Sequence, residues 1–149
     1  MSTEEESKAL VRRFIDDVFV AGRDDAVDDL VADDFVPHSW PGVGPGREPL
    51  KAAQRRVRQG LTDVSMTVED IIAEGDRVAV RLSSRATQSG EFMGMPPSGK
   101  SYAVSETHIF RIADGRIAEH WRDMDSMDLL RQLGALPEPM QKGRTSQSS

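Results

Sequence analysis

Cysteine is absent from the 149 residues, and aromatic side chains are scarce, at 5% of the chain. The lack of cysteine excludes disulfides, thiolate nucleophiles and cysteine-ligated zinc or iron–sulfur sites. No apolar run approaches the roughly 20 residues of a membrane-spanning helix. The acidic start of the chain, residues 1–8, is unlike a signal peptide. We therefore expect a soluble protein of the cytoplasm.

An excess of basic charge is also missing. Lysine and arginine number 19 against 25 acidic residues, and the formal net charge is −6. The densest basic group, Arg55, Arg56 and Arg58, fits the solvent-exposed face of a helix, so neither nucleic acid nor a membrane is an expected partner. The three histidines have no ligand spacing that predicts a metal site, and no nucleophile-elbow motif is present.

The hydrophobic period divides the chain into a helical and a strand-forming part. Apolar residues repeat at helical spacing over residues 3–20, 24–33 and 46–60, and a short helical stretch covers 127–133. Between the second and third helices, two prolines and a glycine in residues 35–42 indicate a loop or short edge strand. From residue 64 the period is two, with a phase slip near Asp70 that predicts a β-bulge. Residues 90–100 hold three glycines and two prolines and read as a loop.

This order predicts a single α+β domain over residues 1–137, with helices packed on one face of a curved antiparallel sheet around a pocket. Residues 138–149 have no apolar period and are expected to form a flexible polar tail.

The pair Asp114-Gly115 lies between two alternating runs and predicts a type I′ hairpin over residues 102–125. Uninterrupted pairing through this turn puts the following facing pairs on one side of the sheet: Ile112 and Ile117, Phe110 and Glu119, His108 and Trp121, Glu106 and Asp123, Val104 and Asp125. That side would hold four carboxylates, which are costly to bury unless paired or protonated. We therefore interpret it as the wall of a pocket with a polar floor.

Several motifs, taken in order, resemble those of the SnoaL-like polyketide cyclases, or ester cyclases. They are the loop 92–100, the runs 109–111 and 114–117 with Glu119 and Trp121, the end 125–134, and His38 with Pro41 and Gly46. The similarity runs from about residue 10 to residue 137. It implies the cone-shaped fold named for nuclear transport factor two. It further implies metal- and cofactor-free closure of a ring in an aromatic polyketide methyl ester by an intramolecular aldol step.

In the resemblance, the acidic residue four positions after the tryptophan is the general acid/base, and Asp125 stands there. A carboxyl group in a poorly solvated pocket can exchange protons in this way because burial raises its pKa. From the residues alone, Asp125 is equally suited to cap the helix that follows it. His108 is a second catalytic candidate, although a histidine on a strand is more often part of the core.

Substrate-binding candidates are His38, Trp40, Trp121, Asp123 and Glu106. The two indoles suit a planar apolar ligand, but Trp121 also fits a plain core position. The Glu106 and Asp123 pair is either catalytic or a structural pair at the pocket rim, with Arg12 or Arg13 as partner.

The sequence thus favours an enzyme, a cofactor-independent cyclase or isomerase acting on a small hydrophobic carbonyl compound of aromatic polyketide type. The alternatives are a non-catalytic ligand-binding protein, a hydrolase resembling limonene epoxide hydrolase with an acid pair around an arginine, and a subunit-interaction protein. Ile109, Ala118 and Met124, expected on the outer face of the sheet, would permit a homodimer.

Overall fold

The computed structural model describes residues 3–136, so the tail expected over residues 138–149 lies outside the described residues. The elements, in chain order, are α1 (Thr3–Phe14), η1 (Ile15–Val20), α2 (Asp24–Leu30), β1 (Val31–Pro37), α3 (Arg47–Gly60), β2 (Leu61–Glu74), β3 (Arg77–Gln88), β4 (Ser101–Ala113), β5 (Arg116–Met124) and α4 (Ser126–Gln132).

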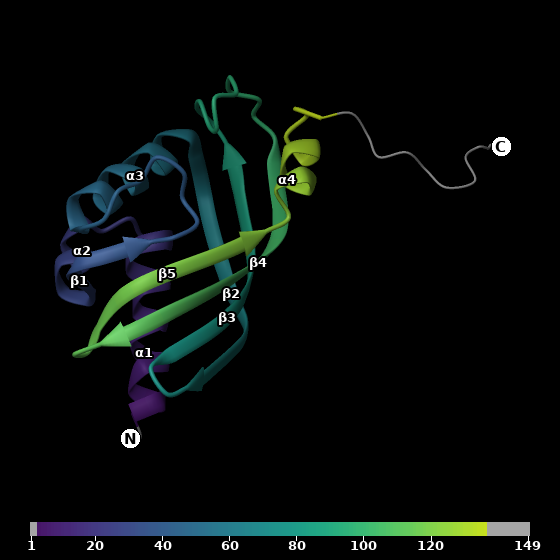
Figure 1. The fold of residues 1–149 in the computed structure, drawn as a ribbon. Helices are drawn as coiled ribbons and strands as arrows, with labels where there is room; N and C mark the ends of the chain where they lie inside the picture. Colours follow the sequence, from purple (N-terminus) through teal and green to yellow (C-terminus); the bar gives the residue numbers. More distant parts are fainter. Residues whose placement is uncertain (1–2, 137–149) are drawn as a thin grey trace.

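Helices α1, α2 and α3 gather on one side of a bent sheet, and α4 lies beside the loop that joins β3 to β4 (Figure 1). The apolar stripe expected over residues 3–20 is the side that is buried, through Val11, Phe14, Ile15 and Val18. This stretch changes from an α-helix to a π-helix at Ile15, a change that the periodicity did not predict. Within residues 3–136, no helix is both long and apolar enough to cross a membrane.

The five strands form one sheet in the order β1-β5-β4-β3-β2. Four of them pair antiparallel, as predicted, and the bulge predicted near Asp70 is a register shift between Val68 and Asp70. Residues 35–42, predicted to be a loop or a short edge strand, begin with the end of an edge strand, β1, which pairs parallel with β5. The second helix ends at Leu30 rather than near Asp33, because β1 begins at Val31.

The predicted type I′ turn is present, with positive φ at both Asp114 (53°) and Gly115 (72°). The uninterrupted pairing that we expected beyond it is wrong. Ile112 faces Ile117, but Arg111 faces Glu119, so Ala118 is an extra residue on β5. Such a bulge turns every later side chain of its strand to the other face.

Beyond the bulge, His120, Arg122 and Met124 of β5 therefore share the concave face with Phe110, His108 and Glu106 of β4. Glu119, Trp121 and Asp123 lie on the opposite face, so the facing pairs predicted for them on the pocket side are wrong, and Met124, expected on the outer face, lies on the concave one. The predicted face of β4 is correct, since Tyr102, Val104, Glu106, His108 and Phe110 are all buried.

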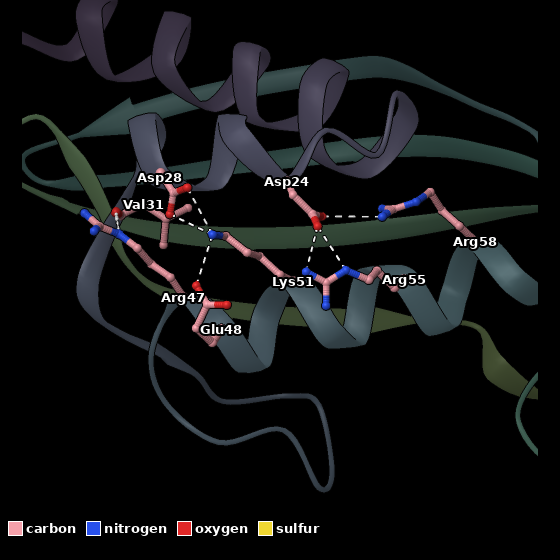
Figure 2. Close-up of polar contacts among 8 residues, drawn as sticks. All are labelled: Asp24, Asp28, Val31, Arg47, Glu48, Lys51, Arg55 and Arg58. Carbon is pink, nitrogen blue, oxygen red and sulfur yellow. Dashed lines mark hydrogen bonds and ion pairs between the residues drawn. The ribbon is translucent and has the colours of Figure 1, made fainter.

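Ion pairs hold α3 against α2 (Figure 2). Lys51 Nζ lies 2.9 Å from Asp28 and 3.0 Å from Glu48, and Asp24 pairs with both Arg55, at 2.8 Å, and Arg58, at 3.4 Å. The face that we expected to be merely solvated thus carries part of the α2–α3 contact. The pairs fix α3 where it covers the open side of the sheet.

Candidate functional site

A cavity of about 590 Å³ lies between the helices and the concave face of the sheet. Phe19 and Trp40 form an aromatic wall, with ring centroids 6.2 Å apart. The polar side chains that the sheet contributes to the cavity lining are Tyr102, Glu106 and His108 on β4 and Arg122 on β5. The other contributors include Gln54 and Val57 on α3, Val64 and Met66 on β2, residues 91–94, and Leu129 on α4.

Three buried polar side chains form a hydrogen-bonded chain at the sheet side of this cavity. Glu106 Oε1 lies 2.8 Å from His108 Nε2, and His108 Nδ1 lies 2.8 Å from His120 Nε2. Glu106 is 5% exposed and the two histidines are 1% exposed. Glu106 and His108 line the cavity, whereas His120 lies behind them against Phe110 and the edge of Trp40.

The charges of this chain follow from its surroundings. Burial raises the pKa of Glu106, but the hydrogen bond and charge of His108, together with the charge of Arg122, lower it more, so the pKa lies below its ordinary value. Burial first, and the nearby cations second, hold the pKa of His120 well below its ordinary value. At neutral pH Glu106 is therefore a carboxylate and His120 a neutral ring.

This protonation fixes the direction of both hydrogen bonds while His108 is neutral. A carboxylate only accepts, so His108 Nε2–H donates to Glu106, and His108 Nδ1 then accepts from His120 Nε2–H. Beside the chain, burial and the Glu106 charge raise the pKa of Tyr102 to about 12. Its phenol is therefore a proton donor at physiological pH. The cavity thus combines one acceptor, Glu106, with donors of different strength.

Three of the predicted binding residues lie away from this cavity. His38 Nε2 contacts Glu119 at 2.8 Å, and its ring stacks on Trp121 with centroids 4.6 Å apart. Arg77 covers the same indole at 4.8 Å. Asp123 is exposed on the same outer face as Trp121. The expected pairing of Asp123 with Glu106 is wrong, because the bulge at Ala118 separates them onto opposite faces.

Asp125, the predicted acid/base, begins α4. Its Oδ1 accepts a hydrogen bond of 3.0 Å from the backbone N–H of Asp128, and its side chain is exposed. Of the two roles that the sequence left open, the helix cap is the one this geometry displays. Asp125 does not line the main cavity.

The loop between β3 and β4 closes one end of the cavity with residues 91–94. A buried glutamine holds it: Gln88 Nε2 donates to the carbonyls of Met95 and Pro96, at 3.2 and 3.0 Å, and Gln88 Oε1 accepts from Ser98 at 2.6 Å. The backbones of Gly60 and Gly90 approach so closely that a Cβ on either would overlap the loop or the end of α3. The loop is therefore fixed at its base.

Sequence reasoning missed Arg122, His120 and Gln54 in this region, and it found Trp40, Glu106 and His108. The signal that could have located the bulge was energetic, because uninterrupted pairing buried four carboxylates. Shifting the register by one residue removes Glu119 and Asp123 from the concave face at once.

In residues 3–136, no group of three or more histidine, aspartate and glutamate side chains could hold a metal ion.

The sequence model of the family described as SnoaL-like polyketide cyclase matches residues 9–133. Nogalonic acid methyl ester cyclase of Streptomyces nogalater is 30% identical over 119 residues, which are 78% of this chain and 89% of that protein. Aklanonic acid methyl ester cyclase DauD of Streptomyces sp. (strain C5) is 27% identical over 138 residues, 90% of this chain and 84% of that protein.

Among solved structures, TsrD from Streptomyces laurentii superposes with a TM-score of 0.83 at 32% identity, covering 91% of this chain and 100% of that chain. These similarities agree with the α+β fold of nuclear transport factor two type that the sequence predicted.

Proposed function

The chain belongs to the SnoaL-like polyketide cyclase family, and we propose that it closes a ring in a planar, aromatic polyketide-like carbonyl compound by an intramolecular aldol reaction. Side chains supply the acid/base chemistry, with neither a metal nor a cofactor in the reaction. The observation that carries the proposal is the chain from Glu106 through His108 to His120 on the wall of the cavity.

Glu106 is the proposed base and acid. The hydrogen bond with His108 uses Oε1, which leaves Oε2 to take a proton from a substrate carbon that lies next to a carbonyl group. The resulting enolate carbon attacks another carbonyl group of the same molecule and forms a carbon–carbon bond. Glu106 then returns the proton to the new alkoxide. The substrate therefore rearranges without gain or loss of atoms.

His108 and His120 position the carboxylate rather than react. The hydrogen bond from His120 selects the tautomer of His108 that donates to Glu106, and a side chain held in this way needs little reorganisation when charge moves. Tyr102 supplies a phenolic donor for a substrate carbonyl. Phe19 and Trp40 give a flat apolar surface on which an aromatic ring system can stack.

A non-catalytic binding protein remains the second candidate, since the cavity alone accounts for it. The hydrolase alternative required an acid pair around an arginine, and Asp123, its expected second acid, is exposed on the other face of the sheet from Glu106.

The test is turnover of nogalonic acid methyl ester and aklanonic acid methyl ester, and of the corresponding free acids, followed by liquid chromatography with mass spectrometry. Ring closure by an aldol step gives a new peak with the mass of the substrate. Glu106→Gln keeps the shape of the side chain but cannot accept the proton, so we expect a loss of about 100-fold or more in kcat.

Asp125→Asn is the matched control, because it also replaces a carboxylate by an amide while leaving the cavity unchanged. We expect it to keep its kcat. A Glu106→Gln variant that retains activity, or an Asp125→Asn variant that loses it, would contradict the assignment and return the acid/base role to Asp125. Binding of these compounds without any turnover would instead favour the non-catalytic alternative.

The homodimer expected from the sequence stays a prediction, and so does the cytoplasmic location. Fewer outer-face residues support the homodimer than the sequence suggested. Met124 lines the cavity and Ala118 is buried, so only Ile109 of the three residues is exposed on the outer face. Light scattering of the purified protein measures the oligomeric state.

A further inference from the structure

Arg122 is a cation without an anionic partner at the cavity wall. Every carboxylate oxygen in residues 3–136 lies beyond ion-pair distance of its guanidinium, and the contact it does make is with the ring of Trp40, 5.7 Å from the centroid. Its backbone N–H is held by Ser39 at 2.8 Å. The nearest acid in the cavity, Glu106, is hydrogen-bonded to His108 instead. The arginine thus retains five donors for a ligand.

Gln54 is a second polar group with unused hydrogen-bonding capacity at the same cavity. It is only 5% exposed, and it lines the cavity from α3. Its side-chain amide makes no hydrogen bond to any other residue in the range 3–136. The amide atoms of Gln54 are not among the fully buried, unpaired side-chain atoms of residues 3–136, so they reach the open space of the cavity and can bond to a polar ligand group there.

We propose that this cavity binds a planar ligand carrying a free carboxylate, with Arg122 as the counter-ion and Gln54 as an additional donor. The planar fork of a guanidinium matches the two oxygens of a carboxylate, and the guanidinium carbon of Arg122 lies over the Trp40 ring, 5.7 Å from its centroid. This inference takes the aromatic skeleton of the ligand from the proposed function, on which it rests. What it adds is the negative charge of the ligand's carboxylate. It separates this chain from relatives named for methyl esters, since an ester carries no charge at that carboxyl group.

The Glu106 carboxylate is the other charge on the cavity wall, and it is hydrogen-bonded to His108, while Arg56 and Glu91 are exposed residues of opposite sign at the rim. The charge of Arg122 lowers the pKa of Glu106, but no carboxylate oxygen of residues 3–136 lies within ion-pair distance of the guanidinium, so its N–H groups are available to a ligand. A charge-assisted hydrogen bond contributes more than a neutral one, and the difference corresponds to about 10- to 100-fold in affinity.

The experiment compares two probes, anthraquinone-2-carboxylate and its methyl ester, by isothermal titration calorimetry on the full chain at pH 7. We expect the wild type to bind the carboxylate about 10- to 100-fold more tightly than the ester. Arg122→Gln should lower affinity for the carboxylate to the level of the ester and leave the ester unaffected. Arg122→Lys, which keeps the charge but not the fork, should keep part of the preference.

Arg81→Gln is the charge-matched control, because Arg81 is exposed and paired with Asp70 far along the sheet surface. It should leave the preference intact. Equal binding of both probes, failure of the carboxylate to bind, or a preference that survives Arg122→Gln would overturn the proposal. Glu106→Gln separates it from the proposed function: turnover should vanish there while the preference for the carboxylate remains.

Discussion

Acidification from pH 7 to pH 5 should destabilise the fold through His120. This ring is 1% exposed and is held neutral, because burial and nearby cations keep its pKa well below its ordinary value. In the unfolded chain the same ring titrates near 6.5. Below pH 6.5 the unfolded state therefore binds a proton that the folded state does not bind, so the free energy of unfolding falls as the pH falls.

The size of the effect is bounded by the pKa of the ring in the unfolded chain. A histidine that titrates near 6.5 when unfolded and is kept neutral in the fold lowers the free energy of unfolding by at most about 2 kcal/mol between pH 7 and pH 5. For a domain of this size, that corresponds to a decrease of roughly 4–8 °C in Tm. Glu106 does not contribute in this window, since its folded pKa lies below the ordinary value of 4.5; its share is lost only in stronger acid.

The measurement is urea unfolding followed by tryptophan fluorescence at half-unit steps between pH 5 and pH 7. His120→Gln replaces the ring by an amide that does not titrate and can still hydrogen-bond to His108. We expect this variant to be less stable at pH 7 but to lose most of the slope. His38→Gln is the control, because His38 is exposed and removal of its ring leaves His120 buried. A slope that persists in His120→Gln would refute the assignment.

Three further predictions concern the cap, the loop and the core. Asp125→Ala removes the acceptor for the Asp128 N–H and should cost about 1 kcal/mol by urea unfolding; an unchanged midpoint would contradict the cap. Gln88→Leu removes the side chain that holds the loop 89–100 and should increase hydrogen exchange there, with exchange in β4 unchanged. Phe110→Ala empties a fully buried site and should cost about 3–5 kcal/mol, whereas a loss below 1 kcal/mol would mean that the core collapses around it.

The helices, the turn and the bulge in β2 were predictable because each depends on local sequence. The apolar stripe of α1, the positive φ at Asp114 and Gly115, and the phase slip near Asp70 are readable within a few residues. The parallel pairing of β1 with β5 was not, because the partners are more than 80 residues apart and the pattern of residues 31–37 also fits a helix end. Strand pairing between distant segments leaves little local trace.

The face that each side chain of the hairpin occupies was predicted correctly on β4 and wrongly on β5 beyond Ala118. Glu106, His108 and Trp40 lie where the sequence placed them, since alternation on β4 is unbroken. Beyond the bulge, alternation continued with the opposite parity, and neither neighbour of Ala118 is a glycine that would mark the break. Two of the misplaced residues, Glu119 and Asp123, are carboxylates whose burial would have required cationic partners, and physical reasoning can weigh that cost even when a pattern cannot.

The extra residue at Ala118 makes the chemistry of the concave face depend on how β5 pairs as well as on which side chains it carries. If the same strand paired without interruption, it would present Glu119, Trp121 and Asp123 there, whereas deletion of Ala118 would remove the bulge and leave His120, Arg122 and Met124 in place. Two relatives with nearly identical β5 sequences can therefore present different reactive groups. Residues of this strand should be equated between relatives by their face of the sheet, and not by their distance from the hairpin turn.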